Sequence, residues 1–283
     1  MPAVVELVRE PETATCQLIL SCPETKKCAI IDPVLNIDLH SGTVSTKSAD
    51  ELLAFVAEKG YTIQWLLDSH VHADHISALH YLQTKTGAPT GIGANVIDVQ
   101  QHFQKAWNLP ASSIEGKFWD HLWKDGDKFQ VGNLNVQVIT TPGHTPADVS
   151  YYIENDCVIV GDSIFQPDLG TARCDFPGGC AHTLWQSVQK LLALPDNVRI
   201  FVGHDYPSGG REFLSETTVA TQKENNKHVK VGSVEAEFTE ARKTRDAQLG
   251  LPKLIYPAMQ FNIRGGRTPV DGHVHVPLRV PFA

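Results

Sequence analysis

Four of the six residues from His70 to His75 carry side chains that can bind a metal ion. The segment reads His-Val-His-Ala-Asp-His and supplies three imidazoles and one carboxylate. Because residues two positions apart on an extended chain point to the same side, His70 and His72 can approach one ion together. Imidazole and carboxylate ligands suit Zn(II) or Fe(II). The segment therefore indicates a metal site rather than a polar surface loop.

Three later motifs carry further candidate ligands, and each follows a predicted strand. His144 lies in Pro-Gly-His-Thr, Asp162 in Gly-Asp-Ser and His204 in Gly-His-Asp-Tyr. A glycine beside each ligand permits a tight turn and a close approach of the backbone. Together with the segment from His70 to His75, these motifs predict one metal centre at the ends of several strands.

The residues alone leave the number of metal ions open. One ion could be held by His70, His72, His144 and Asp162. A second could be held by Asp74, His75, His204 and a bridging Asp162. A site that used only His70, His144 and Asp162 would instead be a two-histidine, one-carboxylate triad with open coordination positions. That triad is the geometry of non-haem Fe(II) oxygenases.

The elements that position these ligands are predicted from hydrophobic periodicity and turn residues. Strands are expected at 16–21, 28–32, 63–67, 128–131, 134–140, 149–153, 157–160 and 199–202. Helices are expected from a capping box at 48–51 up to Gly60, at 76–86, at 183–193 and within 215–247. Residues 33–47 and the tail after Pro252 read as loops. The loop 102–123, with its three tryptophans, has no assigned role.

This order of hairpins and helices favours one fold class. We expect an α+β protein, an αββα sandwich of two mixed β-sheets with helices outside. No linker composition divides the chain. Residues 1–283 are therefore expected to form a single domain, in which residues from about 215 to 283 are a C-terminal extension that closes the substrate cleft.

Composition limits the partners. Lys and Arg number 24 against 32 Asp and Glu, which gives a formal net charge of −8. An acidic chain is a poor candidate for nucleic acid or an anionic membrane surface, because both require clustered cations. No apolar run reaches the ~18 residues of a transmembrane helix, and residues 1–12 lack the apolar region of a signal peptide. We therefore expect a cytoplasmic protein with reduced cysteines.

The four ligand motifs, in this order, resemble those of the metallo-β-lactamase superfamily over most of residues 14–215. Within that superfamily, the chain is most similar to the persulfide dioxygenases, also called sulfur dioxygenases. The residues that carry this closer likeness are Ile31-Asp-Pro-Val34, Gly170-Thr-Ala-Arg-Cys-Asp-Phe-Pro-Gly-Gly-Cys180, Gly203-His-Asp-Tyr206 and Pro257-Ala-Met-Gln-Phe-Asn-Ile-Arg264.

The resemblance implies a reaction and a site. Glutathione persulfide and O₂ would be converted to sulfite and glutathione at one Fe(II), held by His70, His144 and Asp162. The remaining ligand candidates would surround that ion or hold a second one: His72, Asp74, His75 and His204. Glutathione would be held by Arg173, Tyr206, Asn262 and Arg264. The expected partners are the persulfide and O₂, with no nucleic acid and no membrane, and a homodimer is left open.

A second function remains open because every ligand of a two-metal site is present. A dizinc thioester hydrolase resembling glyoxalase II, with two Zn(II) per chain, would use the same motifs. The loop after Asp162 argues against it, because it reads Arg-Cys-Asp-Phe where that family has Gly-Arg-Phe-Phe. A non-catalytic binding module is disfavoured because the ligand set is intact.

Overall fold

The computed structural model describes residues 2–114, 117–207, 209–269 and 272–274, and its strands form two large sheets. The first sheet has the order β1 (Val4–Glu10), β2 (Thr15–Ser21), β3 (Lys27–Ile31), β6 (Thr62–Leu67), β8 (Thr90–Gly93) and β9 (His121–Trp123). Strands β1, β2 and β3 pair antiparallel, whereas β3, β6, β8 and β9 pair in parallel. The first sheet is therefore mixed.

The second sheet is also mixed. Its order is β10 (Lys128–Val131), β11 (Leu134–Thr140), β12 (Val149–Ile153), β13 (Cys157–Ile159), β14 (Arg199–Phe201) and β15 (Glu216–Thr218). Strands β11 and β13 are both antiparallel to β12, and β14 is parallel to β13. Strands β11, β13 and β14 therefore run in one direction and end at the same edge of the sheet. A small third sheet joins β5 (Thr43–Ser45), β4 (Val34–Asp38) and β7 (Ile76–Ser77).

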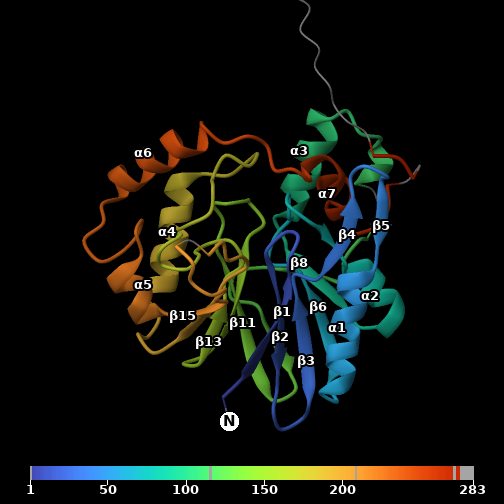
Figure 1. Ribbon diagram of the computed structural model, residues 1–283, viewed down its shortest axis with the longest axis horizontal. Coiled ribbons are helices and arrows are strands. Elements are labelled where there is room, and N and C mark those ends of the chain that lie inside the picture. Colours follow the sequence, from blue (N-terminus) through green and yellow to red (C-terminus); the bar gives the residue numbers. More distant parts are fainter. Residues whose placement is uncertain (1, 115–116, 208, 270–271, 275–283) are drawn as a thin grey trace, which may run out of the picture.

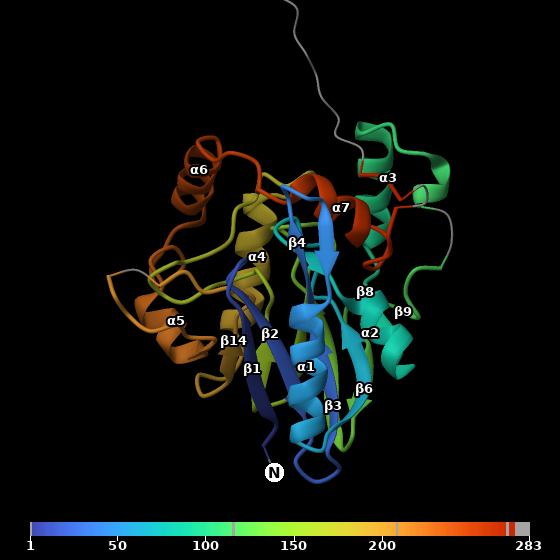
Figure 2. The same cartoon turned by 45° about the vertical axis from the view of Figure 1, so that its right-hand side comes forward.

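Helices pack around the outside of the two large sheets, and several of them lie above the ends of the strands (Figures 1 and 2). Those on the first sheet are α1 (Lys47–Glu58), α2 (Leu79–Thr86), α3 (Val96–Ala106) and α7 (Ile255–Asn262). Those on the second sheet are α4 (Ala181–Leu192), α5 (Val219–Asn225) and α6 (Glu235–Asp246). A short 3₁₀ turn occupies Ala111–Ser113. No helix among the described residues combines the length and apolarity needed to cross a membrane.

Strand β2 shows why the layers stack in this way. All seven of its residues are buried. Leu18 and Leu20 join the core between the two sheets, whereas Ile19 joins the core beneath α1, α2 and α3. Because side chains alternate along a strand, one apolar run supplies both cores. The αββα sandwich expected from the sequence is thereby confirmed.

Several boundaries differ from the sequence expectation. The capping box is wrong: α1 begins at Lys47 after Thr46, and no side chain caps it. The buried Ser48 instead donates its backbone N–H to Asn36 Oδ1 at 3.0 Å. The expected helix at 76–86 begins only at Leu79, because Ile76 and Ser77 pair with β4 as strand β7.

Three stretches expected to be loops contain regular structure. Residues 33–47 hold β4 and β5, and the stretch 102–123 holds the end of α3 and strand β9. The tail after Pro252 holds α7, whose residues 257–262 are all buried. Pro257 is tolerated there because it occupies the first turn, where a backbone N–H has no helical partner. Residues 270–271 and 275–283 of the expected extension lie outside the described residues.

Candidate metal centre

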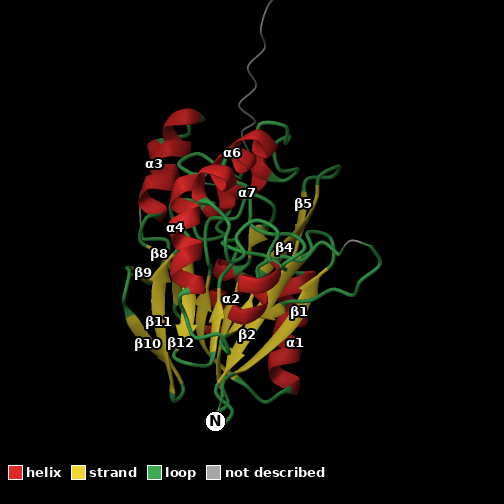
Figure 3. Cartoon of the chain, turned by 90° about the vertical axis from the view of Figure 1, so that its left-hand side faces the viewer, coloured by secondary structure: helices red, strands yellow, loops and turns green. Residues whose placement is uncertain are grey.

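The ligand motifs follow strands of both sheets. The segment that begins at His70 follows β6 of the first sheet, while His144, Asp162 and His204 follow β11, β13 and β14 of the second. Figure 3 shows the loops gathered above the strands, beneath α6 and α7. The backbone N–H of Cys16 donates to Gly203 O at 2.8 Å and so joins the two sheets beside this edge. Strand direction therefore brings the four motifs together, as the sequence predicts.

Three buried side chains form the first potential metal site. Ligand atoms of His70, His144 and Asp162 all lie within 4.8 Å of one another. The Nδ1 of His144 donates to Arg173 O at 2.7 Å, which leaves Nε2 facing Asp162 Oδ2 at 3.8 Å. The Nδ1 of His70 lies 2.9 Å from Ser69 Oγ. These contacts orient both imidazoles with their Nε2 atoms toward the carboxylate.

A second group lies beside the first. Ligand atoms of His72, Asp74 and His75 also lie within 4.8 Å of one another. His204 Nε2 lies 3.2 Å from Asp74 Oδ2 and 3.7 Å from Asp162 Oδ1. Asp162 therefore stands between the two groups, in the place of a bridging ligand.

The chemistry of these atoms fits bound metal. Within the described part of the chain, four of them are buried with no hydrogen-bond partner: His70 Nε2, His72 Nδ1, His75 Nε2 and Asp162 Oδ1. Burying a polar atom without a partner costs free energy, and a metal ion removes that cost. Burial also lowers the pKa of His70 and of His72, so both imidazoles are neutral, the form that binds metal.

Two buried carboxylates that the sequence analysis missed lie behind His72. Its Nε2 is 3.1 Å from Asp32 Oδ1 and 3.9 Å from Asp68 Oδ1. Asp32 also accepts the backbone N–H and the hydroxyl of Ser69 at 2.6 and 2.8 Å. A carboxylate on the far nitrogen fixes a ligand histidine and makes it more basic. The signal in the sequence was Asp32 itself, a polar residue directly after an apolar strand.

Asn262 lies beneath the metal loop. Its Nδ2 donates to the backbone oxygens of His72 and His75 at 2.8 and 2.7 Å, and its Oδ1 accepts from Ser77 N–H at 2.8 Å. Both polar atoms of the Asn262 side chain thus contact backbone between His72 and Ser77. Arg264 is also buried, and its guanidinium lies 5.6 Å from the centroid of the Phe118 ring.

A cleft of about 640 Å³ opens over the metal groups. Asp74, His144 and Asp162 line one side, and Arg173 and Tyr206 also line it. Asn262 and Arg264 are not among the described residues that line this cleft. The Tyr206 ring stacks on His204 with a centroid separation of 5.7 Å and is 49% exposed. Arg173 binds both carboxylate oxygens of Asp175 and donates from Nη1 to Gly250 O at 2.9 Å.

The C-terminal part of the chain supplies the other side of the cleft. Its lining residues are Lys227, His228, Arg242, Arg245, Leu249 and Pro252. None of them was identified from the sequence, because neither the polar helical stretch 215–247 nor the residues just after it carry a recognisable motif. Their arrangement depends on how that stretch folds back over the sheet edge.

Comparisons with known proteins point to one superfamily. The family model described as the metallo-beta-lactamase superfamily matches residues 19–204. "Glyoxylase B2" of Dictyostelium discoideum is 48% identical over 269 residues, which cover 94% of this chain and 92% of that protein. The structure of ETHE1 from Myxococcus xanthus superposes with a TM-score of 0.75 at 30% identity, covering 93% of this chain and 100% of that one.

A further relative is longer than this chain. The "Beta-lactamase hydrolase-like protein" of Xylella fastidiosa strain 9a5c is 49% identical over 260 residues, which cover 92% of this chain. The match covers only 60% of that protein's length.

Proposed function

Because the chain belongs to the metallo-beta-lactamase superfamily, we propose that the cleft is the active site of a persulfide dioxygenase with one non-haem Fe(II). The reaction consumes glutathione persulfide, O₂ and water and releases glutathione, sulfite and two protons. Four electrons pass from the persulfide to dioxygen, and the outer sulfur leaves as sulfite.

The observation that carries this proposal is the buried group of His70, His144 and Asp162 at the cleft. Its ligand atoms lie within 4.8 Å of one another and comprise two imidazoles and one carboxylate. Fe(II) bound there would supply open coordination positions for a soft sulfur ligand and for dioxygen. The likeness to ETHE1 from Myxococcus xanthus supports this class of chemistry, because a relative from Bos taurus, 28% identical over 207 residues, is named "Persulfide dioxygenase ETHE1, mitochondrial".

The chain's own residues hold the site and shape its surroundings. Arg173 O and Ser69 Oγ orient the two imidazoles. Gly203 leaves room for Asp162, because a Cβ at that position would lie 2.4 Å from Asp162 Oδ1. Phe165 and Leu169 line the cleft and give it an apolar part beside the metal groups. Arg173 and Tyr206, which also line it, are proposed to contact substrate.

Metal analysis combined with oxygen uptake tests the proposal. Apoprotein is reconstituted anaerobically with Fe(II) or with Zn(II) and then supplied with glutathione persulfide in air-saturated buffer. We expect one iron per chain and equal amounts of O₂ consumed and sulfite formed, with no uptake by the zinc form. Fe(II)-loaded protein that consumes no O₂ would overturn the proposal.

The group of His72, Asp74 and His75 favours a second candidate, a dizinc hydrolase of glutathione thioesters. His72 Nδ1 and His75 Nε2 are buried and have no hydrogen-bond partner among the described residues, so both atoms could bind a metal ion. The likeness to the protein named Glyoxylase B2 supports it. Two zinc ions per chain, with thioester hydrolysis and no oxygen uptake, would establish this candidate in place of the dioxygenase.

A further inference from the structure

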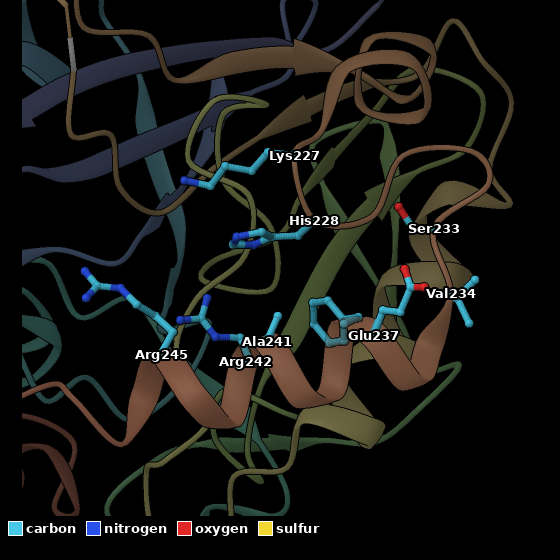
Figure 4. Close-up of a pocket in the computed structure, with 9 residues that line it drawn as sticks. Lys227, His228, Ser233, Val234, Glu237, Ala241, Arg242 and Arg245 are labelled. Atoms are coloured by element: carbon cyan, nitrogen blue, oxygen red, sulfur yellow. The ribbon is translucent and has the colours of Figure 1, made fainter.

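Four nitrogen-bearing side chains from the C-terminal part of the chain, three of them cationic, line one part of the cleft and are called the basic wall here. Lys227 and His228 follow α5, and Arg242 and Arg245 lie on α6. All four line both the 640 Å³ cleft and an adjoining cavity of about 210 Å³. Figure 4 shows their nitrogen-bearing ends pointing toward the same end of the pocket, away from the oxygens of Ser233 and Glu237.

Arg242 is occupied by structural contacts. The side chain is buried, and its Nη2 lies 2.7 Å from Asp246 Oδ1 while its Nη1 donates to Thr171 O at 3.1 Å. The other oxygen of Asp246 accepts the backbone N–H of Cys174 at 2.7 Å. This buried ion pair therefore fastens α6 to the segment that holds His144 through Arg173 O. It sets the position of Arg245, one turn along the same helix.

Lys227 and Arg245 remain available for a ligand. Both are exposed, and in the described part of the chain no carboxylate lies within ion-pair distance of either. Arg173 differs, because its guanidinium already pairs with Asp175 and donates to Gly250 O. Two cations without a carboxylate partner thus face a cleft in a protein whose net charge is −8.

We propose that Lys227 and Arg245 bind the carboxylates of the substrate and select an anionic persulfide over an uncharged one. This inference rests on the proposed function. The sulfur must reach the side of the cleft lined by Asp162, so a carboxylate at the far end of a peptide-sized substrate meets the basic wall. The cleft volume lies within the ~300–1,000 Å³ of sites for small organic ligands. Cations are needed there because an acidic protein otherwise repels an anion.

Single substitutions with matched controls test the proposal. Lys227→Ala and Arg245→Ala should each lower kcat/KM for glutathione persulfide about three- to tenfold, mainly through KM, because each removes one partly exposed charge contact. Metal content and Tm should not change. Lys230→Ala and Lys243→Ala remove the same charge from nearby positions that do not line the cleft, and should change kcat/KM less than about twofold.

The substrate supplies the other half of the test. The persulfide of glutathione ethyl ester lacks one carboxylate and should react more slowly than glutathione persulfide with the wild-type protein. The Lys227→Ala/Arg245→Ala double variant should no longer distinguish the two compounds. Once the two cations are removed, removing the substrate carboxylate has no further effect, so the protein change and the substrate change are not additive. Undiminished discrimination by the double variant would overturn the proposal.

A binding measurement separates this proposal from the proposed function. Calorimetric titration of glutathione into the metal-loaded protein needs no oxygen chemistry. Weaker binding by Lys227→Ala and Arg245→Ala than by the control variants supports the basic wall, even if the wild-type protein consumes no O₂. Normal oxygen uptake together with equal binding by all four variants would reject the wall and leave the dioxygenase intact.

Discussion

At the scale of single residues, the two nitrogens of each ligand histidine have separate tasks. His144 donates from Nδ1 to Arg173 O, and His72 places Nε2 beside Asp32. In each ring the other nitrogen faces the metal groups. A backbone carbonyl thus selects Nε2 in one ring, and a buried carboxylate selects Nδ1 in the other. The choice of nitrogen is fixed by partners far away in the sequence.

His204 is the residue that distinguishes one metal ion from two. We expect His144→Ala and Asp162→Ala to weaken iron binding more than ~100-fold, beyond the 10–100-fold loss typical of outer partners. His204→Ala should weaken it less than about tenfold, because a mononuclear site does not use that imidazole. Iron content after dialysis against a chelator measures all three. Equal losses in His204→Ala and His144→Ala would show that the site is dinuclear or that the three assigned ligands are not the ones that hold the iron.

The lowered pKa of His228 predicts that the stability of the fold depends on pH. Burial, with the nearby cations Arg242 and Lys227, lowers the pKa of His228 to about 4, and its Nδ1 accepts the Thr171 N–H at 3.0 Å. In the unfolded chain the His228 imidazole has its usual pKa of 6.5. Between pH 6.5 and 4 the unfolded chain therefore binds a proton at His228 that the folded chain does not bind. The contribution to stability is therefore complete above pH 6.5 and is lost as the pH falls toward 4.

His228→Asn should remove that part of the pH dependence. The amide oxygen of the introduced side chain can replace Nδ1 as the acceptor for Thr171 N–H but does not titrate. After a discount for the half-buried position, we expect the wild-type protein to lose about 1–2 kcal/mol more stability than the variant between pH 6.5 and 4. Urea unfolding at several pH values measures the difference. If the free energy of unfolding changed equally with pH in the wild-type protein and in the variant, this role of His228 would be refuted.

At the scale of elements, turns and helices hold the ligand loops against one another. Gly161, two residues after the end of β13, packs against the loop after β6: a Cβ there would lie 2.4 Å from Ser69 Oγ. Ser69 in turn contacts Asp32 and His70. On the other side, α7 holds the same loop through Asn262. The metal loop is therefore fixed from two directions by elements distant in sequence.

Gly161→Ala should disturb the metal site as well as the backbone. At φ +50° the new side chain is strained and also displaces Ser69, so we expect a loss of about 2–4 kcal/mol and weaker metal binding. Gly60→Ala is the matched control, because Gly60 has φ +66° and no described residue comes within 4 Å of the place that a Cβ would occupy. It should cost about 1–2 kcal/mol and leave metal affinity unchanged. Equal effects of the two substitutions would contradict the packing role of Gly161.

At the scale of the whole molecule, the ligands come from both sheets. His70 follows β6 of the first sheet, whereas His144 and Asp162 follow strands of the second. A bound ion would therefore connect the two halves of the sandwich. Ligands that bind only the folded state stabilise it by mass action.

Removing the metal should lower the Tm. At a free metal concentration of 100 times Kd the stabilisation is about 2.7 kcal/mol, which corresponds to roughly 4–5 °C for a chain of this size. Thermal unfolding with and without a chelator measures the shift. Asp162→Ala should unfold at the same temperature in both conditions. A wild-type Tm that does not respond to the chelator would show that the ion does not connect the sheets.

The parts of the site that could be predicted from the sequence are those encoded locally. Imidazole spacing and flanking glycines identified the motifs around His70, His144, Asp162 and His204, because each lies where a readable strand ends. Asn262 contacts the backbone of His72 across 190 positions, and no local pattern announces such a contact.

The fold shows the same division. The hairpin of β10 and β11 was predicted at its observed bounds, because side chains alternate along it and Gly132 occupies its turn. Helix α7 was not predicted, because Pro257 and the glycines at 265 and 266 are typical of an irregular tail. Tertiary burial of Met259 and Phe261 stabilises this helix where local preference does not.

The candidate metal ligands and the basic wall that is proposed to bind substrate lie in different parts of the chain. Every candidate ligand lies at or before His204, whereas the basic wall begins at Lys227. A related sequence could thus exchange the stretch 219–254 and accept a different thiol without altering the metal chemistry. For protein engineering, that stretch is a natural graft, provided that Arg242 and Asp246 are retained as its point of attachment.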